Sequence, residues 1–346
     1  MIAAATAPRA HEAHRLLVVG PEGVRDHLAP AAFAGAFLPG DLLVVNDAAT
    51  LPASLVGDGV ELRLLGTEDD RTWTAGLLGA GTWRTPTEER PLPPRCPVGT
   101  QLRFGDLVAT VTRVHDAAWR LVDVVFDRTG AALWSALYRL GNPVQYAHVA
   151  NDLALWDVQN VYAGRPWALE MPSAGRILDG ATVRALQERG VGIATVTHAA
   201  GVSSVGDPVI DAMLPLPERF EVRAETWEAI AAARARGGRV VAVGTSAARA
   251  LEGGARACAT SGVTALRIGP ALRRAVIDGI VTGIHELGTT HFELLEAFVP
   301  RSSLLRALET SRAVGLLGHE LGDAWLVWGK PRPKAQVADQ RLAAWR

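Results

Sequence analysis

Short apolar runs in the first fifty residues predict buried strands. Residues 15–19 (RLLVV) and 42–45 (LLVV) are rich in branched aliphatic side chains and are bounded by glycine or proline turns. Asn46 and Asp47 follow the second run directly. The carboxyl ends of strands in open α/β sheets commonly carry ligand-binding side chains, so these two residues are candidates for function.

The pattern changes between about residue 53 and residue 115. Short alternating segments such as VELRLL and LVATVTRV are broken by glycine, proline and polar turns, which is typical of a small β barrel or sandwich. The segment TGAALWSALYRLG then reads as a helix that ends at Gly141. We therefore expect a β-barrel domain at residues 53–155, inserted into an α/β domain formed by residues 1–52 and 156–346.

Helical and strand patterns alternate through the second half of the chain. This alternation predicts an α/β fold, with a mostly parallel sheet covered by helices. The helical patterns lie at residues 181–188, 224–238, 245–257 and 291–299, and the strand patterns at 192–198, 239–243 and 277–285.

Composition and charge narrow the class of protein. The 346 residues are 49% apolar and 21% charged, which excludes a wholly disordered or fibrous chain. The net charge of −1 gives no overall attraction to nucleic acid or to an anionic membrane. We expect no membrane span, since no stretch reaches 18 uninterrupted apolar residues. We also expect no secretory signal, since the first residues have no basic region and only a short apolar run. Cys96 and Cys258 form neither a disulfide framework nor a zinc motif, so we expect a cytoplasmic location.

The turn Gly244-Thr245-Ser246, between a predicted strand and a predicted helix, is a candidate binding site. Backbone N–H groups and two hydroxyls at such a turn could hold a carboxylate or a ribose. A plain helix N-cap is an equal alternative. Arg249 and Glu252, three residues apart on the helix, are more often an ion pair than a site.

Two histidines follow predicted strands. His198 and His285 could act as acid or base near neutral pH, although a single histidine is usually structural. Asn46 and Asp47 are also compatible with ordinary turn chemistry.

Taken in order, several segments resemble one known family, the S-adenosylmethionine:tRNA ribosyltransferase-isomerases of queuosine biosynthesis. They are RLLVV, PGDLLVVND, LPASLVG, VELRLL, VQNVYA, PSAG, GRVVAVGTSAARALE, IGP with VIDGIVTGIH, and GDA. The resemblance implies an α/β domain with an inserted β barrel. It also implies transfer of the ribosyl portion of S-adenosylmethionine to a 7-deazaguanine base in tRNA, with release of adenine and methionine. It implies no metal.

The resemblance also implies which residues form the site. Asp47 or His285 would act as the acid or base, because the chemistry needs proton removal beside a sulfonium. The residues that match the family's other motifs would hold the donor: Asn46, Tyr162, Ser173, Gly175, Gly244, Thr245, Ser246, Arg249 and Asp323.

The sequence departs from the family pattern at polar positions. Arg176-Ile177-Leu178 stands where the family has L-H-F, so that histidine is absent. Neither histidine of the family's D-H-x-M-H-x-E segment is present, which leaves Glu218. His198 is displaced by one residue, which on a strand turns a side chain to the opposite face. Two alternatives therefore stay open: a diverged enzyme that transfers from S-adenosylmethionine to a small molecule or water, and a binding protein without turnover.

Overall fold

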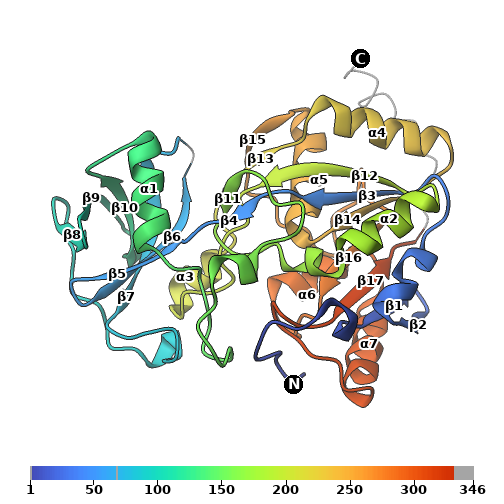
Figure 1. Cartoon of the computed structure of the whole chain (residues 1–346), viewed down its shortest axis with the longest axis horizontal. Helices are drawn as coiled ribbons and strands as arrows, with labels where there is room; N and C mark the ends of the chain where they lie inside the picture. Colours follow the sequence, from blue (N-terminus) through green and yellow to red (C-terminus); the bar gives the residue numbers. More distant parts are fainter. Residues whose placement is uncertain (1, 68, 331–346) are drawn as a thin grey trace.

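Two β sheets dominate the protein. The computed structural model describes residues 2–67 and 69–330, so residues 331–346 of the predicted α/β domain lie outside the described part. One sheet has six strands and the other has nine. Figure 1 shows the smaller sheet at one end of the molecule and the larger sheet at the other. A small parallel pair, β4 (Ala49–Thr50) and β11 (Pro166–Ala168), lies between them.

The nine-stranded sheet brings together both ends of the described chain. Strand β17, the last strand of the described residues, lies between β16 and β1. In spatial order the strands are β15 (Ser261–Thr264), β13 (Glu218–Glu221), β12 (Gly192–His198), β3 (Leu42–Asn46), β14 (Val240–Val243), β16 (Gly279–Gly283), β17 (Ala324–Trp328), β1 (Leu16–Gly20) and β2 (Gly23–Leu28).

This sheet is mixed, so the prediction of a mostly parallel sheet is not confirmed. Parallel pairing joins β12, β3, β14 and β16, and also joins β17 to β1, while the other neighbours are antiparallel. Strand β2 follows β1 after a two-residue turn, and so short a connection permits only antiparallel pairing. Strand β13 (ERFE) and the edge strand β15 (SGVT) lack the apolar runs that identify buried strands, and β17 was not predicted either.

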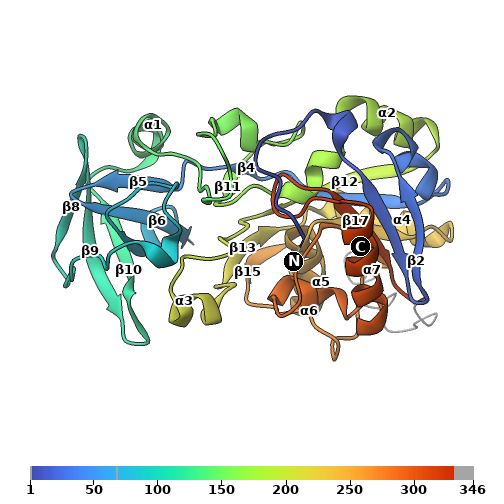
Figure 2. The ribbon, with the colours of Figure 1, turned by 90° about the horizontal axis from the view of Figure 1, so that it is seen from below.

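Helices cover both faces of the large sheet, because consecutive side chains of its central strands point to opposite faces. Leu42 and Val44 pack in one core with α4 (Ala224–Ala235), α5 (Thr245–Ala257), α6 (Thr290–Leu295) and α7 (Arg301–Ala313). Leu43 and Val45 pack in a second core with α2 (Gly180–Glu188) and the 3-10 helix η2 (Pro30–Ala36). Figure 2 shows α2 on the opposite side of the sheet from α5, α6 and α7. The predicted strand–helix alternation is confirmed in this part.

The six-stranded sheet is the predicted barrel-like unit. All its neighbouring strands are antiparallel, and the end strands approach each other where Gly57 of β5 faces the backbone of Arg103 in β8. In spatial order they are β5 (Ser54–Gly57), β6 (Val60–Thr67), β7 (Thr72–Gly79), β10 (Ala118–Phe126), β9 (Leu107–His115) and β8 (Gln101–Phe104).

Helix α1 (Gly130–Leu140) adds Leu133 and Leu137 to the barrel core, as the helix pattern predicted. The same core also contains Ile210 and Leu214, from α3 (Pro208–Met213) and the residue that follows it. The barrel therefore packs against a segment outside the predicted insertion, and the division at residues 53 and 155 stays a prediction. The remaining short 3-10 helices are η1 (His11–Ala13), η3 (Thr87–Glu89), η4 (Leu155–Val158) and η5 (Ser173–Ile177).

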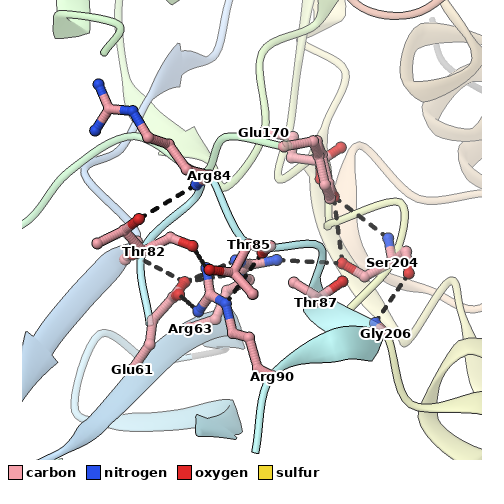
Figure 3. A network of polar contacts seen from close by, with 12 residues as sticks. Glu61, Arg63, Thr82, Arg84, Thr85, Thr87, Arg90, Glu170, Ser204 and Gly206 are labelled. Atoms are coloured by element: carbon pink, nitrogen blue, oxygen red, sulfur yellow. Dashed lines mark hydrogen bonds and ion pairs between the residues drawn. The ribbon is translucent and has the colours of Figure 1, made fainter. Parts of the chain in front are cut away.

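A buried ionic network lies at the same junction (Figure 3). Glu61 of β6 accepts hydrogen bonds from Arg63 (Nε–Oε1 2.9 Å) and from Arg90, and all three side chains are almost fully buried. Arg63 also donates to the backbone oxygen of Ser204 at 3.5 Å. The network thus joins the barrel to the segment between β12 and α3.

No helix within residues 2–67 and 69–330 combines the length and the apolar character that crossing a membrane requires.

Candidate functional site

The turn between β14 and α5 opens on a cavity. Gly244 has a φ of 94°, a conformation that strongly favours glycine, and it is the N-cap of α5, so that helix has no side-chain cap. A Cβ at Gly244 would lie 3.6 Å from the Cβ of Ala174. Thr245, the first residue of the helix, lines the cavity. The backbone N–H groups of this first helical turn are therefore presented beside an open space.

This cavity has a volume of about 90 Å³ and a wall of both polar and apolar residues. Its sides come from the β12–α3 segment, the start of α5, the loop before β16 and the start of α6. The polar or charged residues that line it are Ser203, Glu218, Thr245, Arg249, Arg267, Thr290, His291 and Glu293.

Glu218 and Arg249 form a buried ion pair in the cavity wall. The carboxylate of Glu218 also accepts a hydrogen bond from the backbone N–H of Gly201 at 2.7 Å. Burial raises the pKa of Glu218 to about 7, although the Arg249 charge opposes the rise. Glu218 therefore gains and loses a proton near neutral pH, as a general acid or base must.

His198 points toward this ion pair despite its displaced position. Its Nε2 lies 3.3 Å from the Glu218 carboxylate, and the side chain is fully buried. Burial, aided by the Arg249 charge, holds the pKa of His198 well below its ordinary value, so the ring is neutral. Glu252, in contrast, does not pair with Arg249. Its carboxylate accepts hydrogen bonds from the backbone N–H groups of residues 275–277, at 2.7–3.1 Å.

Asn46 and Asp47 point to opposite sides of the strand end. Asn46 is buried and donates to Ser246 Oγ at 3.2 Å and to the His198 carbonyl oxygen at 3.0 Å, so it ties the turn at Gly244 to β12. Asp47 accepts a hydrogen bond from Thr197 at 2.5 Å and one from Arg223 at 3.2 Å. Asp47 is not among the residues that line the 90 Å³ cavity.

His285 lies beside that cavity. Its ring stacks on the ring of His291, with centroids 4.8 Å apart, and its Nε2 is 2.8 Å from Thr282 Oγ1. Burial and the neighbouring His291 and His319 hold the pKa of His285 well below its ordinary value. The imidazole is therefore neutral, and a neutral imidazole can accept a proton.

Four other candidates lie in or beside a second, smaller cavity of about 10 Å³. Ser173 and Asp323 line it. Asp323 is buried and fully engaged, because Arg9, Arg15 and the Leu317 N–H all donate to its carboxylate. Gly175 faces Tyr162, whose hydroxyl occupies the space that a side chain at Gly175 would need.

Sequence reasoning missed several polar residues near these cavities, among them His291, Arg267 and Glu170. His291 and Arg267 line the larger cavity, and neither belongs to a motif that we recognised. Glu170 is buried and accepts hydrogen bonds from Ser203 N–H at 2.9 Å and from Tyr146. Burial, with the nearby Glu320 charge, raises the pKa of Glu170 to about 7. The only sequence signal for Glu170 was its position, two residues before the PSAG segment.

Comparison with known proteins identifies similar sequences along nearly the whole chain. The family model described as "Queuosine biosynthesis protein" matches residues 1–327. The S-adenosylmethionine:tRNA ribosyltransferase-isomerase of Anaeromyxobacter sp. (strain Fw109-5) is 34% identical over 91% of this chain and 92% of its own length. The protein of that name from Acidithiobacillus ferrooxidans is 33% identical over 94% of each chain.

One solved structure supports the fold. The crystal structure of S-adenosylmethionine tRNA ribosyltransferase from Thermotoga maritima matches with a TM-score of 0.51 and 22% identity, over 94% of this chain and 96% of that chain. At this level of identity the match supports the shared α/β and barrel architecture.

Proposed function

Because the chain belongs to the queuosine biosynthesis protein family, we propose that it is an S-adenosylmethionine:tRNA ribosyltransferase-isomerase. The reaction moves the ribosyl portion of S-adenosylmethionine to the amine of a 7-deazaguanine base in tRNA, and it releases adenine and methionine. S-adenosylmethionine is a substrate here, and the transfer needs no metal. A tRNA substrate favours a cytoplasmic location.

The observation that carries this proposal is the convergence of distant polar residues on the 90 Å³ cavity. Thr245 and Arg249 come from α5, Glu218 from β13, and His291 from α6, and His285 stacks directly behind His291. The start of α5 suits the carboxylate of the donor's methionine portion, since helix N-termini bind anions. Gly244 and Asn46 would hold that turn in place, and Ser246 would anchor it through its bond with Asn46.

Proton removal beside the sulfonium is the step that needs a base. The sulfonium acidifies the adjacent ribose C–H, and departure of adenine follows loss of that proton. Glu218 is suited to this step because its pKa of about 7 leaves it partly ionised at neutral pH. His285, a neutral imidazole, would then accept the proton of the attacking amine. Asp47 stays a predicted catalytic residue, and we place it on the acceptor side with Arg223.

Arginine and tryptophan side chains next to Asp47 suit the tRNA. The guanidinium groups of Arg165 and Arg219 lie 4.7 and 3.8 Å from the centre of the Trp167 ring. Aromatic and guanidinium planes stack on unpaired RNA bases, and their charge attracts phosphates. We therefore propose that the anticodon loop approaches along this face.

The test is release of adenine from S-adenosylmethionine by the purified protein. We expect release in the presence of tRNA that carries the 7-deazaguanine amine, and we expect Glu218→Gln and His285→Ala each to lower kcat by about 10²- to 10⁴-fold. The activity of the wild type should rise with pH through about 7, because Glu218 must be ionised.

His115→Ala is the matched control. His115 pairs with Asp123 at 3.0 Å in the barrel, away from the cavity, so its loss should leave kcat unchanged. Adenine release without tRNA would instead support a diverged enzyme with a small acceptor or water. Binding of S-adenosylmethionine without any product, under all tRNA conditions, would contradict the proposed function.

A further inference from the structure

A second polar cluster lies where three distant segments meet. His148 belongs to the loop after α1, and His319 and Glu320 belong to the turn before β17. The N-terminal segment runs alongside both. Ala5 N–H donates to Gly318 O at 3.1 Å, and Ala150 N–H donates to Thr6 O at 2.7 Å.

The three side chains approach each other closely. One ligand atom from each of His148, His319 and Glu320 lies within 4.8 Å of the other two. The rings of His148 and His319 have centroids 4.4 Å apart, and Nε2 of His148 is 3.1 Å from Oε2 of Glu320.

The contact between His148 and Glu320 is misaligned for a hydrogen bond. Nε2 of His148 is buried and has no hydrogen-bond partner among the described residues, although the carboxylate oxygen is close. Two ligands about 2.0–2.1 Å from a tetrahedral zinc ion lie roughly 3.3 Å apart. The separation of 3.1 Å is close to that value, and the two atoms are not aligned as a donor and its acceptor, so the geometry suits two atoms that point at a shared ion.

We propose that His148, His319 and Glu320 bind one divalent transition-metal ion of the zinc class. Two imidazoles and a carboxylate form a well-known ligand set for zinc, whereas magnesium and calcium prefer oxygen ligands alone. His319 and Glu320 also line the smaller cavity, whose volume of about 10 Å³ is about the least that admits one water molecule. That water would complete a four-coordinate site.

The ion would act as a structural clamp. The local apolar core is small, since the buried residues Ala5, Val149 and Leu321 form a separate cluster with Leu153 and Leu317 packed against it. So small a core holds three segments weakly, and a metal bound only by the folded chain adds its binding free energy to folding. The clamp is independent of the transfer chemistry that we propose for the larger cavity.

The experiment uses the full-length protein, stripped of metal with a chelator. Zinc chloride alone is titrated by calorimetry, and the melting temperature is measured with and without zinc. We expect one zinc per chain and a rise in melting temperature of several degrees. Cobalt(II) alone should give the visible absorption of a tetrahedral site. His148→Gln, His319→Gln and Glu320→Gln should each weaken zinc binding by at least about tenfold.

His115→Gln is again the control, because it removes a histidine–carboxylate pair that lacks a third ligand. It should leave zinc binding unchanged. A wild-type protein whose melting temperature and calorimetric trace do not respond to zinc would overturn the proposal and leave a simple ion pair. Zinc binding and the melting temperature are measured on the wild-type protein without substrate. A negative result here is therefore distinct from a negative result in the transferase assay.

Discussion

At the scale of single residues, Gly175 occupies a position that no larger side chain can share. A Cβ there would collide with the hydroxyl of Tyr162 and lie 2.7 Å from Nδ2 of Asn160. We expect Gly175→Ala to lower the free energy of unfolding by about 1–3 kcal/mol, because buried neighbours must move apart. Urea unfolding measures this change. Gly269→Ala is the control, since nothing lies within 4 Å of its added Cβ. Equal midpoints for the two variants would contradict the prediction.

Glu170 makes the free energy of unfolding depend on pH, because its pKa is raised in the folded protein. Its folded-state pKa of about 7 lies above the ordinary value of 4.5, so the folded protein holds this proton more tightly than the unfolded chain. The stabilisation is present below pH 4.5 and is lost as the pH rises through about 7. Glu170→Gln imitates the protonated form, and its amide can donate to Ser203 Oγ in place of accepting.

We therefore expect Glu170→Gln to match the wild type in stability near pH 4.5 and to exceed it by about 1–3 kcal/mol at pH 8. Thermal unfolding of both proteins across this pH range measures the difference in stability. The buried histidines are present in both proteins, so their own pH-dependent contribution to stability cancels in this difference. A difference that does not vary with pH would rule out the raised pKa.

The sequence predicted only part of the residue-level arrangement. The turn at Gly244 and the inward position of Asn46 follow from a strand that ends beside a helix start. The direction of His198 did not follow, because its ring is set by burial against Glu218 on a neighbouring antiparallel strand. No periodicity within one segment reports such a neighbour.

At the scale of elements, Glu252 joins α5 to the segment before β16. Its fully buried carboxylate accepts hydrogen bonds from three consecutive backbone N–H groups, at residues 275–277. In Glu252→Gln the amide nitrogen would face one of these donors. We expect a loss of about 1–3 kcal/mol in the free energy of unfolding, since a buried donor is left without an acceptor.

Chemical denaturation tests this expectation. Glu309→Gln, on the exposed side of α7, is the control and should change stability by less than about 0.5 kcal/mol. If both variants unfold at the same denaturant concentration, Glu252 does not stabilise the link between these elements.

Elements with strong local patterns were predicted correctly, and those defined by their partners were not. Helix α1 and strand β12 carry a full amphipathic or apolar pattern. Strands β13 and β15 are four-residue polar segments that become strands only because they pair with β12 and with each other. The orientation of a strand depends on its connections, so the mixed sheet could not be derived from apolar runs alone.

At the scale of the whole molecule, the network of Glu61, Arg63 and Arg90 connects the barrel to the site-bearing part (Figure 3). In Glu61→Gln the two buried guanidinium groups would lose their counter-charge. We expect a loss of about 3–5 kcal/mol in the free energy of unfolding. The exposed Glu89→Gln is the matched control. Urea titrations of the two variants compare them, and a Glu61→Gln protein as stable as the control would refute the prediction.

The position of β17 has a consequence for synthesis of the chain. Among the described residues, the hairpin β1–β2 pairs with the rest of the large sheet only through β17, because β1 pairs with β2 on one side and with β17 on the other. Chains grow from the N-terminus, so this hairpin leaves the ribosome long before its partner strand exists. The edge of β1 that pairs with β17 in the folded protein therefore stays unpaired until almost the entire protein has been translated. An unpaired edge can pair with another chain, so crowded nascent chains would be most vulnerable to misassembly just before that last strand is made.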